Sequence, residues 1–130
     1  KQVKEYQLSR DVRDQKYPDA VLKIWALGQE RTLALEYERM QKASLRYKDI
    51  LWAYSRTDSL AMVIFICESD AIKSTIKGRL KYLRLPELWS RMAFADAKDW
   101  IKNPADAPIE LGDQRLTLRG LCQSPEEKVA

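Results

Sequence analysis

The stretch DAVLKIWALGQERTLALEYE, residues 19–38, decides which fold this sequence favours. Ala20, Leu22, Ile24 and Ala26 occupy every second position, and a period of two is typical of a β-strand. Gly28-Gln29 supplies residues suited to a tight turn, and Thr32–Glu38 has the composition of a second strand. The stretch therefore predicts a β-hairpin.

Helix and strand patterns alternate downstream of this hairpin. Apolar residues at helical spacing predict helices over Lys42–Thr57 and Asp70–Leu85. The wholly apolar run Leu60–Cys67 indicates a strand that is covered on both faces. Because a helix joins the hairpin to this strand, we expect an α/β fold with a small mixed sheet flanked by helices. The shorter elements predicted after Pro86 are a strand over Arg91–Ala95, a helix over Asp96–Lys102, and a hairpin of Ile109–Leu111 and Arg115–Leu118 around Gly112-Asp113.

The length of 130 residues favours a single domain, which we expect to span residues 17–121. Residues 1–16 are predicted to form a helix or a linker from a missing upstream domain, since the chain begins at Lys1 and not at methionine. Residues 122–130 are expected to form a polar tail.

Composition excludes several classes of function. Histidine is absent, which removes histidine-dependent triads and His-ligated zinc. Cys67 and Cys122 are too few for a four-thiolate zinc site, and unpaired thiols favour a reducing, cytoplasmic location. The longest apolar run, Leu60–Cys67, is far shorter than the ~20 residues of a membrane-spanning helix. Any catalysis is therefore expected to use carboxylates, lysines, hydroxyls or a bound metal.

Positive charge is concentrated on the two central predicted helices, although the net charge is only +4. Basic and aromatic residues are interleaved in segments 39–56 and 73–91, and each segment contains one acid. Such a surface could face nucleic-acid phosphates, and the alternative is a solvated helix face whose aromatic residues belong to the core. The residues predicted to contact DNA are Arg39, Arg46, Lys48, Lys73, Lys77 and Lys81.

A group of carboxylates is predicted on one face of the hairpin. Glu36 and Glu38 lie two residues apart on a strand, so their side chains share a face. Asp19 opens the neighbouring strand on the same face as Lys23. A register that places Asp19 or Lys23 opposite Glu36 would gather a patch able to hold Mg²⁺, which accepts one or two carboxylates and retains several waters. The alternative is ordinary surface charge, in which an ion pair contributes at most about 1 kcal/mol.

The spacing of Asp19 and Glu36-Tyr37-Glu38, on a hairpin that precedes a helix, resembles the PD-(D/E)xK phosphodiesterase superfamily. More narrowly, Tyr17-Pro-Asp-Ala-Val-Leu, Leu-Ala-Leu-Glu-Tyr-Glu-Arg, Lys42 and Tyr47 are similar to the nuclease-like domain of replication-relaxation proteins of plasmids and mobile elements. The similarity covers roughly residues 17–94. It implies a restriction-endonuclease-like fold, DNA as the partner and a winged-helix domain upstream.

The resemblance also implies roles for individual residues. Asp19 would be the first acid and Glu36 the second, and together they would hold the magnesium ion. The lysine that the superfamily carries two residues after the second acid is replaced here by Glu38, which would act as a further ligand or orient water. The remaining roles would fall to a displaced lysine, Lys23 or Lys42, and to an additional helix acid, Glu5 or Asp11.

Three functions remain open from the sequence. The first is a magnesium-dependent DNA phosphodiesterase in a plasmid or mobile-element replication, relaxation or mobilisation protein. The second is a degenerate, non-catalytic DNA-binding accessory domain with the same fold. The third is a protein-interaction or oligomerisation module, such as a homodimer. The tryptophans, expected in the core or at an interface, are Trp25, Trp52, Trp89 and Trp100.

Overall fold

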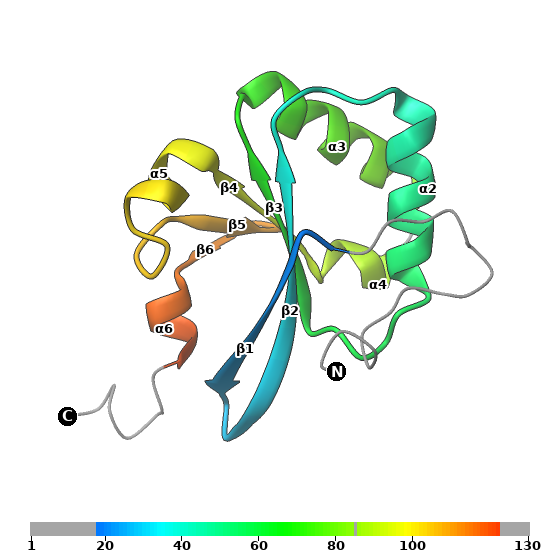
Figure 1. The fold of residues 1–130 in the computed structure, drawn as a ribbon. Helices are drawn as coiled ribbons and strands as arrows, with labels where there is room; N and C mark the ends of the chain where they lie inside the picture. Colours follow the sequence, from blue (N-terminus) through cyan, green and yellow to red (C-terminus); the bar gives the residue numbers. More distant parts are fainter. Residues whose placement is uncertain (1–17, 85, 123–130) are drawn as a thin grey trace.

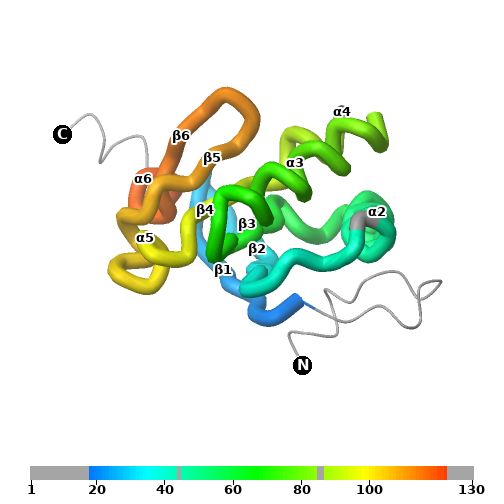
Figure 2. The backbone as a smooth tube through the Cα atoms, turned by 90° about the horizontal axis from the view of Figure 1, so that it is seen from above, coloured from blue at the N-terminus to red at the C-terminus, as the bar shows by residue number. Residues whose placement is uncertain are grey.

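The computed structural model describes residues 18–84 and 86–122 of the chain. The strands among these residues form one six-stranded mixed sheet in the order β1-β2-β3-β4-β5-β6, with helices on both faces (Figures 1 and 2). The β2–β3 and β3–β4 pairs are parallel, and the other pairs are antiparallel. This confirms the α/β class. The strands are β1 (Ala20–Ala26), β2 (Gln29–Glu38), β3 (Met62–Cys67), β4 (Met92–Asp96), β5 (Ile109–Leu111) and β6 (Gln114–Leu116).

The helices form two groups on opposite faces of the sheet. One group connects the parallel strands, and Figure 2 shows it on one side of the sheet, with the other group on the opposite side. The first group contains α2 (Ser44–Ser55), α3 (Asp70–Leu83) and α4 (Pro86–Trp89), and the second contains α5 (Ala97–Lys102) and α6 (Leu118–Cys122). None of the described helices is long and apolar enough to cross a membrane.

The first hairpin turns one residue earlier than the sequence predicts. Leu27 and Gly28 form the turn with φ angles of 55° and 81°, so both central residues are left-handed. Positive φ at both positions matches the right-handed twist of the strands, but leucine rarely adopts it. As a result Gln29 belongs to β2, which is three residues longer at its start than the predicted Thr32–Glu38.

Other element ends also differ from the prediction. α3 ends at Leu83 because Arg84 adopts the left-handed conformation, with φ 54° and ψ 50°. Its start is fixed by Ser69, whose hydroxyl accepts a hydrogen bond from the Ile72 N–H at 3.3 Å. The Gly112-Asp113 turn is confirmed, but Leu118 begins α6, a helix that was not predicted.

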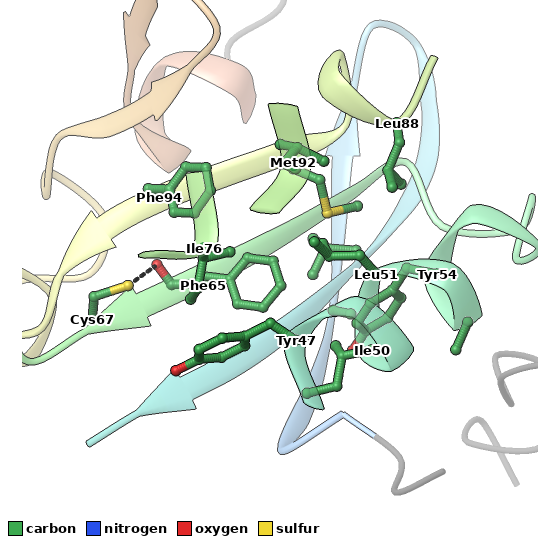
Figure 3. Close-up of a cluster of buried hydrophobic side chains, with 14 of the residues drawn as sticks. Tyr47, Ile50, Leu51, Tyr54, Phe65, Cys67, Ile76, Leu88, Met92 and Phe94 are labelled. Carbon is green, nitrogen blue, oxygen red and sulfur yellow. Dashed lines mark hydrogen bonds between the residues drawn. The ribbon is translucent and has the colours of Figure 1, made fainter. Parts of the chain in front are cut away.

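Two apolar cores lie on the two faces of the sheet. β3 is buried at every position, which confirms the strand covered on both faces. Phe65 faces the α2 and α3 side, where its ring stacks on Phe94 with centroids 5.7 Å apart (Figure 3). Ile64 belongs to the opposite core, with Trp100 of α5 and Leu118 of α6. The predicted helix or linker over residues 1–16, with Glu5 and Asp11, and the tail after Cys122 lie outside the described residues.

Candidate functional site

The register of the first hairpin places Asp19 and Glu36 at the same level. Ala20 pairs with Leu35 in the antiparallel ladder, so the next step along it sets Asp19 opposite Glu36. The Asp19 Oδ2 atom accepts a hydrogen bond from the Tyr37 backbone N–H at 2.7 Å. Just before β1 begins, the Asp19 carboxylate therefore takes the place of the backbone carbonyl that would accept this hydrogen bond in a continued ladder.

Glu36 and Glu38 share one face of β2, as predicted, and that face lies beneath α2. Both side chains are completely buried. The Tyr54 hydroxyl donates to Glu36 Oε2, and the Tyr47 hydroxyl lies 3.4 Å from Glu38 Oε1 in donor geometry. Thus the two acids meet two phenols from the same helix.

Lys42 is the lysine that reaches these acids. Its Nζ atom forms an ion pair with Glu38 Oε1 and lies 5.7 Å from the centroid of the Tyr47 ring. Its backbone N–H also donates to the Tyr47 hydroxyl oxygen at 3.1 Å. Lys23 instead pairs with Thr32 in the ladder, and its Nζ lies 3.9 Å from Glu30 Oε1. We use the name acid centre for Asp19, Glu36, Glu38 and Lys42.

The phenols above the acid centre stay protonated. Burial raises the pKa of Tyr54 far above its ordinary value, and the charge of Glu36 raises it further. Burial also raises the pKa of Tyr47, and the hydrogen bond from Lys42 opposes this in part. Both hydroxyls are therefore hydrogen-bond donors at neutral pH.

Sequence reasoning missed Tyr47 and Tyr54 as partners of the acids. They lie seven residues apart, which is two helical turns, so both fall on the apolar stripe that carries Ile50 and Leu51 (Figure 3). A hydroxyl on a buried stripe needs an acceptor, and the acids of the preceding strand provide it. Two tyrosines on the apolar side of a helix, together with two acids on the preceding strand, are the sequence signal that could have identified these partners.

The acid centre fits a magnesium ion poorly. Over residues 18–84 and 86–122, no group of three or more His, Cys, Asp or Glu side chains is placed to hold a metal ion. Mg²⁺ requires near-octahedral oxygen ligands and usually keeps several waters, but Glu36 and Glu38 are enclosed and Asp19 is engaged with the backbone. Glu38 Oε2 departs from this pattern, since it is buried and accepts no hydrogen bond from the described residues.

The thiol nearest the acid centre is inert. Cys67 is paired with Glu38 across the β2–β3 ladder and is buried. Burial raises the pKa of the Cys67 thiol to about 12, and the nearby Glu38 charge acts in the same direction. A neutral, buried thiol is a poor nucleophile. Cys67 therefore serves as a packing residue of the core.

The six predicted DNA contacts divide into two groups. Lys73 Nζ lies 3.0 Å from Glu110 Oε2 and 3.0 Å from Asp96 Oδ1, and Lys77 Nζ lies 2.7 Å from Glu110 Oε1. These two lysines are neutralised within the fold, so we do not assign them to DNA. The other four remain at the surface, with Lys48 half-buried and Arg39, Arg46 and Lys81 exposed.

The Glu110 network predicts a pH-dependent loss of stability. Hydrogen bonds from Lys77 and Lys73 lower the pKa of Glu110 below its ordinary value of 4.5, against an opposing effect of burial. A lowered pKa in the folded state contributes stability above the ordinary value that is lost as the pH falls through the folded-state value. We expect Glu110→Gln to cost about 1 kcal/mol at pH 7 and clearly less at pH 2.5, below the ordinary pKa of the group.

Urea denaturation at both pH values checks this prediction. Glu87→Gln is the matched control, since Glu87 is an exposed acid, and it should change little at either pH. A Glu110→Gln deficit of the same size at pH 7 and pH 2.5 would contradict the ionic origin.

Apolar side chains also gather at the surface away from the acid centre. Trp25 and Leu27 are exposed near the first turn, and a hollow of about 630 Å³ lies nearby, lined by residues that include Leu22, Ile24 and Leu118. The tryptophans Trp25, Trp52 and Trp89 are exposed and Trp100 is half-buried, so none of the four is a fully buried core residue. An interface role and a homodimer remain predictions.

Comparisons with models of known protein families, with curated proteins and with solved structures find no match for this chain. The similarity to the PD-(D/E)xK superfamily and to replication-relaxation proteins therefore remains a prediction. It is carried by the hairpin residues Asp19, Glu36 and Glu38, together with the strand–strand–helix–strand order of β1, β2, α2 and β3.

Proposed function

We propose that this chain is a non-catalytic, DNA-associated accessory domain of a plasmid or mobile-element replication, relaxation or mobilisation protein, with a PD-(D/E)xK-like architecture. The observation that carries this proposal is the burial of two carboxylates of the acid centre, Glu36 and Glu38. Glu36 and Glu38 are completely buried beneath α2, and both are bonded within the fold. Two of the three acids that the resemblance assigns to the site therefore lie in the core, and Asp19 is exposed.

Hydrolysis of a phosphodiester needs an accessible metal and an accessible water. A metal-bound water becomes the nucleophile, and the same metal stabilises the charge that develops on the phosphate. A metal bound at Glu38 Oε1 would have to displace the ammonium of Lys42, and one bound at Glu36 Oε2 would compete with the Tyr54 hydroxyl. Since the lysine of the superfamily motif is also replaced by Glu38, two parts of the catalytic apparatus are altered together.

DNA association is supported by the distribution of exposed charge. Arg46 and Lys48 lie on α2, Arg39 lies between β2 and α2, and Lys81 lies on α3. α2 and α3 pack side by side over one face of the sheet, so these residues belong to one side of the molecule (Figure 2). Binding through such residues is expected to release counterions and to weaken as salt increases.

The competing candidate is a magnesium-dependent DNA phosphodiesterase. It is favoured by Glu38 Oε2, because a buried carboxylate oxygen that accepts no hydrogen bond from the described residues is a position where an ion could bind. It is also favoured by the ladder, which brings Asp19 level with Glu36.

One set of titrations separates the two candidates. We expect calorimetry to show no Mg²⁺ or Mn²⁺ binding at millimolar metal, and Glu38→Gln to leave affinity for DNA unchanged. The double variant Arg46→Gln/Lys48→Gln should weaken DNA binding and reduce the slope of log affinity against log salt by about 2. Lys102→Gln, an exposed lysine on the opposite face, is the matched control.

Either part of the proposal can be overturned. Metal binding that disappears in Glu38→Gln, accompanied by DNA cleavage, would establish the phosphodiesterase. A wild-type chain that binds no DNA at low salt would remove the DNA association.

A further inference from the structure

The surface at the end of α3 contains a hollow that the acid centre does not use. It measures about 590 Å³ and is lined by Gly78, Lys81, Tyr82 and Arg84. We call it the α3 groove. None of the described residues that line the groove is acidic. They come from the part of the sequence that is richest in basic residues.

Tyr82 presents its ring to solvent at this groove. The residue is 72% exposed, so its ring is accessible to a partner. The Arg79 guanidinium carbon lies 5.1 Å from the ring centroid, so a cation–π contact holds the ring in place. A ring that is held but uncovered is prepared to stack on a planar partner at a small entropic cost.

Nothing in the fold requires a glycine at position 78. Glycine inside a helix is less favourable than alanine because its backbone loses more freedom on folding. A Cβ atom built at Gly78 would meet nothing within 4 Å, and its φ angle does not lie in the left-handed region. Neither packing nor backbone geometry therefore requires glycine here. What glycine does provide is bare helix backbone on the wall of the groove, to which a ligand can approach closely.

We propose that the α3 groove binds single-stranded DNA, with an unpaired base stacked on Tyr82 and the adjoining phosphates near Lys81 and Arg84. An exposed aromatic ring flanked by cations is an arrangement that binds single strands. Each base offers a face for stacking, and each phosphodiester link carries a negative charge. Bases in a duplex are already stacked on each other and cannot reach the ring. This proposal rests on the proposed DNA association and adds the form of DNA and its position.

The test compares a fluorescently labelled dT oligonucleotide with a duplex of the same length by anisotropy, at several salt concentrations. Tyr82→Ala should weaken single-strand binding about ten-fold, and Tyr82→Phe should retain it, because the ring and not the hydroxyl makes the stack. Lys81→Gln and Arg84→Gln should each reduce the salt slope by about 0.7. Trp25→Ala, which removes an exposed aromatic residue from β1, is the control and should have no effect.

Gly78→Ala gives a test that misfolding cannot imitate. The added methyl group should raise the urea midpoint, since alanine is the better helix residue and meets no neighbour. The same methyl group should weaken single-strand binding, because it occupies the groove wall. A more stable variant that binds less tightly shows that the groove itself is the site.

The results distinguish this proposal from the proposed function. If duplex affinity depends on Arg46 and Lys48 but single-strand affinity ignores Tyr82 and Gly78, the groove proposal is wrong and the DNA association stands. If the wild type binds neither form of DNA, both are wrong. Tighter binding of an RNA oligonucleotide or of an acidic peptide at Tyr82 would also overturn the assignment to DNA.

Discussion

Replacing Lys42 by methionine is expected to lower the free energy of unfolding by about 3 kcal/mol at pH 7. The Lys42 side chain is 24% exposed and the Glu38 side chain is fully buried, so the substitution leaves a carboxylate enclosed without its ammonium partner. The hydroxyl of Tyr47, at 3.4 Å, is a weak substitute. Urea denaturation followed by circular dichroism measures the loss.

Two further variants identify the cause. Lys42→Met/Glu38→Met, which removes both charges, should recover most of the loss, because an apolar pair of similar volume can replace a buried ion pair. Lys48→Met, a half-buried lysine on α2, is the control and should cost less than about 0.5 kcal/mol. If Lys42→Met were no worse than Lys48→Met, the acid centre would not be a structural charge pair.

The second large effect is expected at Arg91. Its guanidinium donates to three backbone carbonyls, those of Thr57 at 2.9 Å, Leu60 at 3.1 Å and Tyr54 at 3.2 Å. These carbonyls belong to the end of α2 and to the loop that leads into β3. Arg91→Ala leaves all three acceptors without this donor, and we expect it to cost about 3 kcal/mol.

The conservative replacement separates geometry from charge at Arg91. Arg91→Lys keeps the charge but lacks the planar fork that reaches several carbonyls at once, so it should recover less than half of the loss. Arg115→Ala, at an exposed position of β6, is the matched control and should stay within about 0.5 kcal/mol of the wild type. Full recovery by lysine would mean that the charge alone matters.

The strands were the most predictable part of this fold. β3 is apolar and buried at all positions, so burial pattern and sequence pattern agree there. The first hairpin is confirmed by its antiparallel ladder, although the burial of β1 does not alternate as its sequence does. The turn at Leu27 was missed because tertiary structure imposes a left-handed conformation on a residue that does not favour it. The boundary of α3 was missed for the same reason at Arg84.

The candidate site was predictable only in part. The shared face of Glu36 and Glu38 follows from strand geometry, but their burial depends on which side of the sheet α2 crosses. Lys73 and Lys77 resembled DNA contacts because their partner, Glu110, lies more than thirty residues away in the sequence. Charge pairs that form through tertiary structure cannot be read from local charge density.

The order of the sheet has a consequence for folding. Each strand after β1 pairs with the strand that precedes it in the chain, so its first partner has already been synthesised when the strand emerges. A topology dominated by such near-neighbour pairing closes short loops and favours rapid folding. The side chains that meet around Glu36 and Glu38 come from residues 19–54, so the polar centre has all these partners once α2 has emerged from the ribosome. β3 to β6 can then add one at a time, as the chain is synthesised, onto a hairpin whose register is already fixed.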